Sequence, residues 1–309
     1  MRRVDFSFLT SITPFDHNEL MSAIGEMCAQ YDFLDLHYIG TSILNRPIPL
    51  LTVGNGARKV LYVGAHHGME WITSFVLCRF LASVCDAFEQ KEHIHGVSVP
   101  LLFDCVTLCI IPMLNPDGVS YQIHGVDDEN PLFERVLAMN GGERDFQHWQ
   151  ANARGVDLNH NYDACFHEYK KIEAENGILQ GAPTRFSGEH PESEPEVSAL
   201  CNWIRFHENV SGILTLHTQG EEIYYRCRGT CAKRAPAIAE RISSLCGYRL
   251  AEAEGAASFG GLTDWCALEA RIPCFTLECG RGINPLPFED AGGIYRKLER
   301  LFFRFPMLL

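Results

Sequence analysis

Residues 60–70 read VLYVGAHHGME, an apolar run that leads directly into two potential metal ligands. The apolar half predicts a buried strand, and the strand gives way to a helix at His67 and Glu70. Side chains at positions i and i+3 of a helical turn share a face, so both can reach one ion. His66 competes with His67, but its i+3 residue is Met69, a poor zinc ligand. We therefore expect His66 to hydrogen-bond nearby backbone.

Two further apolar runs end in the same way. Residues 212–217 (GILTLH) end at His217, and residues 274–278 (CFTLE) end at Glu278. Open α/β sheets bind ligands at the carboxyl ends of their strands, so these endings meet at one edge. Imidazole and carboxylate suit zinc, and a further carboxylate beside the ion can act as general base. The three endings together predict a three-ligand zinc site with a base, typical of a zinc hydrolase.

Each ending also has a structural alternative. His-x-x-Glu alone is compatible with a solvated surface pair, and His217 with a core histidine bound to a carbonyl. Glu278 could form an ion pair with Arg281 or Arg271, because a buried carboxylate needs a partner. The zinc hypothesis is favoured by the combination of the three endings.

Composition places the chain among ordinary soluble globular proteins. It has 309 residues, 46% hydrophobic and 21% charged, with no repeat, low-complexity tract or linker. We expect one catalytic domain over residues 1–309. The net charge of -13 argues against a nucleic-acid partner, which usually requires a basic face.

The same composition bears on location. Residues 1–6 carry two arginines but no apolar segment follows them, so no signal peptide is predicted. No stretch reaches about 18 uninterrupted apolar residues, the length that predicts a membrane span. The 13 cysteines are odd in number and scattered, as expected of free thiols in a reducing compartment. We therefore expect a cytoplasmic protein; its oligomeric state is unknown from the sequence.

Buried strands alternate with helical patterns along the chain, which predicts an α/β fold with a mixed, mostly parallel central sheet flanked by helices on both faces. Ser193 to Glu196 form a predicted capping box with Pro195 in the first turn. The weak, polar pattern over 120–190 predicts long loops across one face. We expect strands at 34–41, 46–53, 59–65, 103–112, 212–217 and 272–278, and helices at 17–30, 71–88, 193–207, 231–246, 263–270 and 293–303.

Over nearly its whole length the chain resembles the zinc carboxypeptidases, the carboxypeptidase A-like metallopeptidases. Residues 67–71 (HGMEW) resemble the family's His-x-x-Glu-Trp motif, and residues 115–118 (NPDG) resemble its turn. Residues 155–159 (GVDLN) resemble the segment that places substrate-binding residues. Residues 260–265 (GGLTDW) and 275–278 (FTLE) resemble the specificity wall and the general base.

The resemblance implies a site and a mechanism. His67, Glu70 and His217 would hold one zinc ion, and Glu278 would activate the water that zinc polarises. An arginine near the site would stabilise the oxyanion, and Arg154 is the candidate for that catalytic role.

Departures from the family pattern affect substrate recognition. His160 follows Asn159 where the family carries an arginine that clamps a terminal carboxylate, and imidazole cannot form the bidentate fork of guanidinium. Ala256 stands where those enzymes carry a tyrosine in a mobile loop. Thr263 lies where the side-chain pocket is lined, and a small polar residue there does not suit a large aromatic side chain.

Residues 158–162 (LNHNY), 217–222 (HTQGEE) and 282–287 (GINPLP) are similar instead to a bacterial branch that cuts γ-D-glutamyl-diamino acid bonds in cell-wall peptides. The resemblance implies substrate-binding roles for Asn159, His160, Arg154, Thr263 and Gln219. Arg226, Arg228 and Arg281 are additional candidates for contacts with anions, although each is equally compatible with a surface charge.

Three functions are compatible with these motifs. The first is zinc-dependent hydrolysis of the γ-D-glutamyl-meso-diaminopimelate amide in murein peptides. The second is a metallocarboxypeptidase or deglutamylase that releases C-terminal amino acids from ordinary peptides. The third is a peptide receptor without activity, against which the retention of Glu278 and the full ligand set argue.

Overall fold

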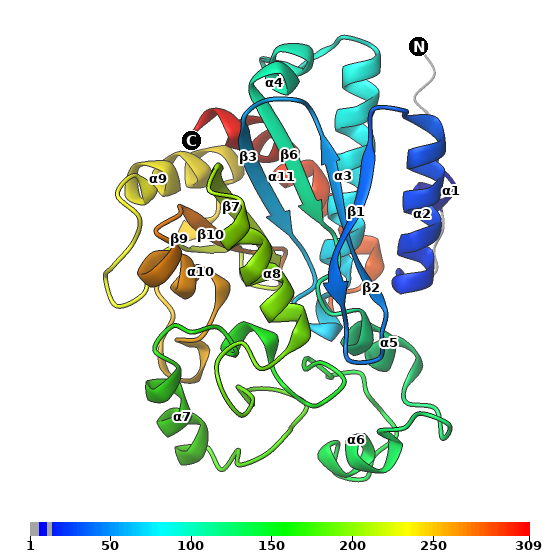
Figure 1. Ribbon diagram of the computed structural model, residues 1–309, viewed down its shortest axis with the longest axis vertical. Coiled ribbons are helices and arrows are strands. Elements are labelled where there is room, and N and C mark those ends of the chain that lie inside the picture. The colour runs from blue at the N-terminus through cyan, green and yellow to red at the C-terminus, as the bar shows by residue number, and fades with distance from the viewer. Residues whose placement is uncertain (1–5, 11–13) are drawn as a thin grey trace.

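In the computed structural model, which describes residues 6–10 and 14–309, eight strands form one sheet in the order β1-β2-β6-β3-β7-β10-β8-β9 (Figure 1). Four of the seven strand pairs are parallel, namely β6/β3, β3/β7, β7/β10 and β8/β9. The predicted mixed, mostly parallel sheet is confirmed. Its strands are β1 (Asp35–Thr41), β2 (Pro47–Val53), β3 (Arg58–Val63), β6 (Val106–Ile111), β7 (Val210–His217), β8 (Glu222–Tyr224), β9 (Arg249–Leu250) and β10 (Cys274–Glu278).

The remaining strands, β4 (His93–Ile94) and β5 (Val97–Ser98), form a separate pair. Residues 1–5, on which the signal-peptide prediction mainly rests, lie outside the described residues. The α-helices are α1 (Ser7–Thr10), α2 (His17–Gln30), α3 (Ile72–Glu89), α4 (Val99–Cys105), α5 (Pro116–His124), α6 (Phe133–Met139), α7 (Phe166–Glu175), α8 (Pro195–Phe206), α9 (Ala235–Cys246), α10 (Leu262–Trp265) and α11 (Ala291–Arg304). Short helical turns are η1 (Gly68–Glu70), η2 (Leu158–His160), η3 (Gly255–Ala257), η4 (Cys266–Ala270, a π-turn), η5 (Phe288–Asp290) and η6 (Phe305–Met307).

Helices cover both faces of the sheet, as predicted (Figure 1). Alternate residues of β3 point to opposite faces, so Tyr62 joins the core under α2, α3 and α11 while Leu61 joins the core under α8 and α10. Both side chains are fully buried. This double coverage explains why the central strands are almost continuously apolar.

One segment, Gly68–Glu89, is long and apolar enough to cross a membrane by composition alone. It comprises η1 and α3, and most of its residues are buried inside the protein. Helix α3 packs against α2 and α11, so the folded core accounts for its apolar composition.

Local structure differs most from the prediction in two regions. The strand expected over 103–112 begins only at Val106, because residues 99–105 form α4 with Pro100 in its first turn. The segment 120–190, expected to be loop, contains the end of α5 and all of α6 and α7. Helix α7 buries only Phe166, Tyr169 and Glu173, so its sequence carries little apolar periodicity.

The predicted capping box at the start of α8 is wrong. Glu194 is the N-cap residue, and Pro195 opens the helix one residue later than a Ser193 cap would require. The Ser193 hydroxyl donates to the Glu194 carboxylate at 2.8 Å. The Glu196 carboxylate turns inward and accepts a hydrogen bond from the Ile43 amide at 3.3 Å.

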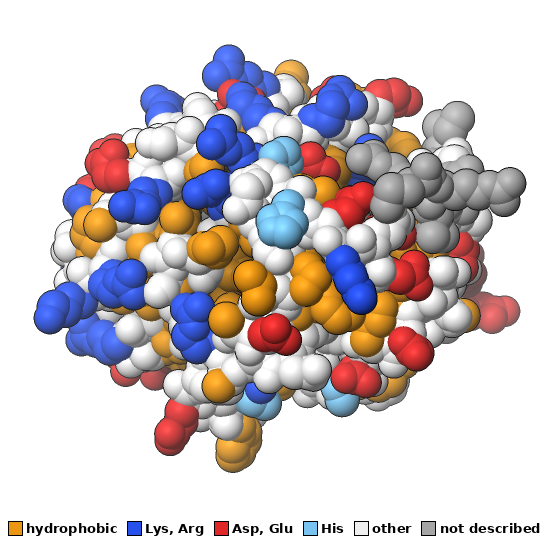
Figure 2. Space-filling view, turned by 90° about the horizontal axis from the view of Figure 1, so that it is seen from above, with side chains coloured by type: hydrophobic (Ala, Val, Ile, Leu, Met, Phe, Trp, Pro, Cys, Tyr) orange, Lys and Arg blue, Asp and Glu red, His pale blue; other side chains and the backbone are white. Residues whose placement is uncertain are grey.

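The surface carries charges of both signs. Seen from above, Lys and Arg side chains lie mainly on the left and upper part of the face and Asp and Glu side chains mainly on the right and lower part, with hydrophobic side chains between them (Figure 2).

Candidate metal centre

The chain leaves β3 in a tight turn that is anchored from two sides. The Asn115 side chain donates to the His66 carbonyl at 3.0 Å and to the Ala151 carbonyl at 3.1 Å, and accepts from the Gly118 amide at 2.9 Å. A Cβ at Gly68 would lie 2.4 Å from the Gly118 carbonyl oxygen, so only glycine allows this approach. The NPDG segment therefore ties the turn in place in addition to opening α5.

His67, Glu70 and His217 converge at the carboxyl ends of β3 and β7. The Nδ1 atoms of the two histidines are 3.2 Å apart, and they lie 3.0 Å and 3.1 Å from the two Glu70 carboxylate oxygens. Tetrahedral zinc with bonds of about 2.0–2.1 Å separates its ligand atoms by about 3.3 Å. These three buried side chains could therefore hold a metal ion with little movement.

A second carboxylate orients the first histidine. The His67 Nε2 lies 3.1 Å from the Asp157 Oδ1, which leaves Nδ1 directed toward Glu70 and His217. Burial opposes a charge on His67, but the Glu70 and Asp157 carboxylates outweigh it and raise the pKa of His67 well above its usual value. The two carboxylates thus favour positive charge at the position where a cation would bind.

His66 does not join this cluster, but its partners differ from those expected. Its Nε2 lies 2.9 Å from the Tyr162 hydroxyl and its Nδ1 lies 3.3 Å from the Thr215 hydroxyl, so it bonds side chains and not backbone. Its ring stacks against that of His217 with centroids 5.1 Å apart. His66 therefore packs against the His217 ring and helps to fix its orientation.

Glu278 stands beside the cluster by virtue of strand register. In the parallel pair β7/β10, Glu278 is the partner of His217. Among the described residues it forms no ion pair, and Arg281 pairs instead with Glu221 at 2.8 Å. Burial and the nearby Glu70 carboxylate raise the pKa of Glu278 well above its usual value. The ion-pair alternative is thus not observed among the described residues.

Glu278 opens onto a cavity that also receives two of the expected substrate-binding residues, Asn159 and Thr263. The Asn159 side chain accepts from the Leu262 amide at 3.2 Å, and the Thr263 hydroxyl bonds the Thr276 hydroxyl at 2.7 Å. Gln219 lies exposed two residues after His217 and is not among the lining residues. The cavity is lined by Asn159, Tyr224, Arg226, Ala253, Ala257, Gly261, Thr263, Asp264, Thr276 and Glu278.

His160 lies behind the cavity wall. Its Nδ1 lies 2.7 Å from the Phe259 carbonyl oxygen, and its ring stacks on Tyr169 with centroids 3.9 Å apart. Burial lowers the pKa of His160, which favours the neutral ring. The positive φ of Gly260 (+74°) and its contact with the His160 backbone keep the two segments together. His160 thus supports the cavity wall through Phe259, and its neutral ring offers no positive charge to a substrate carboxylate.

Arg154 occupies a different position from the one expected. Its guanidinium binds the Glu194 carboxylate at 3.0 Å and 3.1 Å and donates to the Ser193 carbonyl at 3.1 Å. It lines a separate cavity with Arg135 and Phe186, which contains none of the three clustered residues. The structure therefore does not bring Arg154 to the Glu278 cavity.

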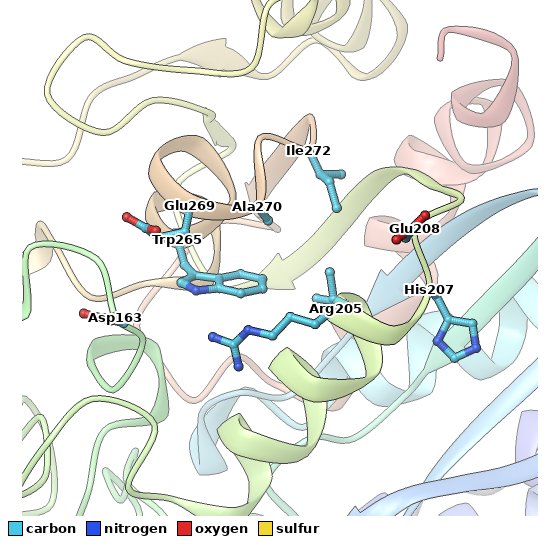
Figure 3. A pocket seen from close by; sticks show the side chains of 9 residues that line it. Asp163, Arg205, His207, Glu208, Trp265, Glu269, Ala270 and Ile272 are labelled. Carbon is cyan, nitrogen blue, oxygen red and sulfur yellow. The ribbon is translucent and has the colours of Figure 1, made fainter.

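Another hollow lies between the end of α8 and α10, away from the cluster (Figure 3). One of its charged side chains, Arg205, lies over the Trp265 ring at 5.2 Å and binds Glu192 at 2.7 Å. These contacts satisfy the guanidinium within the protein, and none of the three clustered residues lines this hollow.

Asp157, Tyr224 and Asp264 belong to the site but were not predicted from the sequence. Asp157 could have been noticed, because a metal-binding histidine usually donates its other nitrogen to a carboxylate. Asp264 lies in the GGLTDW segment that resembles the specificity wall, so a signal for it was present. No local signal distinguishes Tyr224, which reaches the cavity through the antiparallel pairing of β8 with β10.

A buried His-Glu-His cluster and an adjacent carboxylate, at the carboxyl ends of a parallel sheet, define a metal-dependent α/β hydrolase. Residues 20–288 match the zinc carboxypeptidase family. The chain belongs to this family, whose members are zinc-dependent peptidases.

Individual relatives agree with this assignment. γ-D-Glutamyl-L-diamino acid endopeptidase 1 of Lysinibacillus sphaericus is 32% identical over 301 residues, which cover 97% of this chain and 74% of the relative. The structure of bovine thrombin-activatable fibrinolysis inhibitor superposes with a TM-score of 0.71 at 20% identity, covering 96% of this chain and 97% of the other. Murein-tripeptide amidase MpaA of Escherichia coli O157 gives 0.52 at 19% identity, covering 87% and 91%. At these identities the two structures establish the fold alone.

Proposed function

We propose that the chain is a zinc-dependent peptidase that hydrolyses the amide bond between the γ-carboxyl of D-glutamate and meso-diaminopimelate in murein peptides. The observation that carries this proposal is the 32% identity, over 97% of the chain, to a γ-D-glutamyl-L-diamino acid endopeptidase. The cluster and its cavity supply chemistry that fits the reaction.

His67, Glu70 and His217 would hold one zinc ion, since neutral imidazole and carboxylate match its ligand preference and their atoms lie at suitable separations. A bound zinc ion would polarise the scissile carbonyl and lower the pKa of water. Asp157 would keep His67 in the tautomer that leaves Nδ1 free.

Glu278 would act as general base and then as general acid. Its carboxylate borders the cavity and has no ion-pair partner among residues 6–10 and 14–309, so it can accept a proton from water and return it to the leaving nitrogen. Asn159 and Thr263 would position the substrate from the cavity wall, and the exposed Gln219 would contact it from the rim. A contribution of Arg154 would require its guanidinium to leave Glu194.

The second candidate is release of C-terminal amino acids from ordinary peptides, as a metallocarboxypeptidase or deglutamylase. The family as a whole favours it, but His160 stands where family carboxypeptidases have an arginine, and its ring is engaged with Phe259 and Tyr169. We therefore favour hydrolysis of the murein peptide over release of C-terminal amino acids.

The test is hydrolysis of L-Ala-γ-D-Glu-meso-diaminopimelate by the purified protein, with and without a zinc chelator. Release of free diaminopimelate that the chelator abolishes and added zinc restores would support the proposal. Cleavage of unmodified peptides without cleavage of this substrate would favour the second candidate. Tight binding without turnover by the zinc-loaded protein would favour a peptide receptor.

We also propose a cytoplasmic site of action on murein peptides released from the wall. All 13 cysteines are free thiols, which is the state favoured in a reducing compartment. Fractionation of cells that produce the native gene product, followed by immunodetection, tests this location.

A further inference from the structure

The cavity beside Glu278 contains both a guanidinium and a carboxylate. Ile223 and Tyr225 are buried while Tyr224 and Arg226 alternate with them, so Tyr224 and Arg226 face the cavity from β8 and its extension. Asp264 enters the same cavity from α10. The two charged groups thus come from different sides of one small space.

Arg226 is only partly engaged within the protein. Its Nη1 donates to the Glu252 carboxylate at 3.2 Å, but the Glu252 side chain is 64% exposed, so this ion pair is weak. Its Cζ lies 4.6 Å from the centre of the Tyr225 ring, which supports the guanidinium plane. Its Nε is buried and has no hydrogen-bond acceptor among the described residues. The guanidinium therefore has donors available for a carboxylate.

Asp264 is the complementary group. One carboxylate oxygen accepts a hydrogen bond from the Gly261 amide at 3.1 Å, and no Lys or Arg of the described chain forms an ion pair with it. Burial raises the pKa of Asp264 to about 6, while hydrogen bonds from the Gly261 amide and the Cys227 thiol partly offset this rise, so the carboxylate is still mostly ionised at neutral pH. A buried carboxylate without a cation is unfavourable unless a ligand supplies one.

We propose that Arg226 and Asp264 bind the zwitterionic end of the leaving amino acid's side chain, Arg226 its carboxylate and Asp264 its ammonium group. The inference rests on the proposed function and specifies its substrate class as diamino acids that carry a second carboxylate. Lysine offers the ammonium group alone. Arg226 is then the residue that distinguishes diaminopimelate from lysine, whereas Asp264 serves both.

The test compares L-Ala-γ-D-Glu-meso-diaminopimelate with the same peptide ending in L-lysine. We expect the wild-type protein to prefer diaminopimelate in kcat/KM. Arg226→Gln should lower kcat/KM for the diaminopimelate peptide about 10- to 100-fold, the equivalent of one charge-assisted contact, and change the lysine peptide less than about threefold. Asp264→Asn, which keeps an acceptor for the Gly261 amide, should lower both.

A third peptide, in which the side-chain carboxylate of diaminopimelate is amidated, should behave like the lysine peptide with the wild-type protein. Arg226→Lys provides a second variant that keeps the charge without the fork, and it should retain part of the preference. Arg228→Gln is the matched control, because Arg228 is exposed, pairs with Glu168 at 3.2 Å and does not line the cavity.

The outcomes separate this inference from the proposed function. Cleavage of both peptides with equal kcat/KM would overturn the inference and leave the function standing. Equal losses for both peptides in Arg226→Gln would also overturn it, because Arg226 would then contact the terminal carboxylate that both share. Cleavage of neither peptide by the zinc-loaded wild type would reject the proposed function and the inference with it.

Discussion

Glu278 makes no ion pair among the described residues, whereas Glu70 and Asp157 both contact His67. Replacing Glu278 with glutamine keeps its size and removes its ability to take a proton. We expect kcat for the murein peptide to fall by about 100- to 10,000-fold while the zinc content stays at the wild-type value. Steady-state kinetics and metal analysis of the same preparation test this.

Glu269→Gln serves as control for the Glu278 variant, because Glu269 is exposed and lies outside the cavity. Retained activity in Glu278→Gln would remove Glu278 from the role of base. Loss of zinc together with activity would instead assign it to the metal site.

Asp157 acts on the metal only through His67. Asp157→Asn can keep the hydrogen bond from the Asn159 amide but loses the charge that fixes the imidazole. We expect zinc affinity to fall about 10- to 100-fold, measured by competition with a chromogenic chelator. Asp163→Asn, an exposed aspartate in the same segment, should bind zinc like the wild type. An unchanged affinity in Asp157→Asn would contradict this role.

At the scale of single residues, the sequence predicted what depends on local pattern. His67 and Glu70 share a turn, and His217 and Glu278 end apolar strands, so spacing and hydrophobicity were enough to bring them together. Arg154 could not be placed in this way, because its partner Glu194 lies 40 residues away. The partner of His160, Phe259, is 99 residues away, and only the folded chain brings them together.

Among the helices and strands, α8 contains a buried glutamate, Glu196. Burial raises the pKa of Glu196 to about 8, whereas an unfolded chain releases this proton near 4.5. The folded state therefore binds more protons between these values, and the free energy of unfolding should decrease as pH rises from about 5 to about 8.

Glu196→Gln stays neutral at every pH and should flatten that part of the stability profile by about 1 kcal/mol or more. Urea unfolding at pH 5.5 and pH 8 measures the difference. Glu208→Gln, an exposed residue just beyond the same helix, should leave the slope unchanged. Parallel profiles for wild type and Glu196→Gln would show that Glu196 is ionised in the folded protein.

Sequence pattern predicted strongly apolar elements better than polar ones. Helix α2 has the predicted bounds because Asp16 caps it and its apolar residues recur at helical spacing. Helix α7 (FHEYKKIEAE) was missed, because its contacts with the rest of the protein are few and mostly made by aromatic rings and Glu173. The start of β6 was missed because α4 and β6 form one almost uninterrupted apolar stretch.

For the whole molecule, metal binding and folding should be linked. His67 precedes η1, Glu70 ends η1 and His217 ends β7, about 150 positions further on, so the site exists only in the folded chain. We expect zinc at 1,000 times its Kd to stabilise the folded state by about 4 kcal/mol, and a chelator to remove that gain. Thermal unfolding with and without the chelator measures it.

Glu278→Gln should keep this stabilisation and thereby separate metal binding from catalysis. His217→Asn should abolish it, since one of the three ligands is then lost. A melting temperature that does not respond to zinc in the wild type would contradict a metal site at this cluster.

The register between β7 and β10 has a consequence for how such a site can change during evolution. Because His217 and Glu278 are strand partners, the register of this parallel pair sets their relative position. Deleting a single residue from 274–277 would exchange the inward and outward sides of that strand and send the carboxylate into the opposite core. Insertions and deletions among descendants of this sequence should therefore accumulate in the loops between elements. They should spare β7 and β10, whose lengths must remain matched.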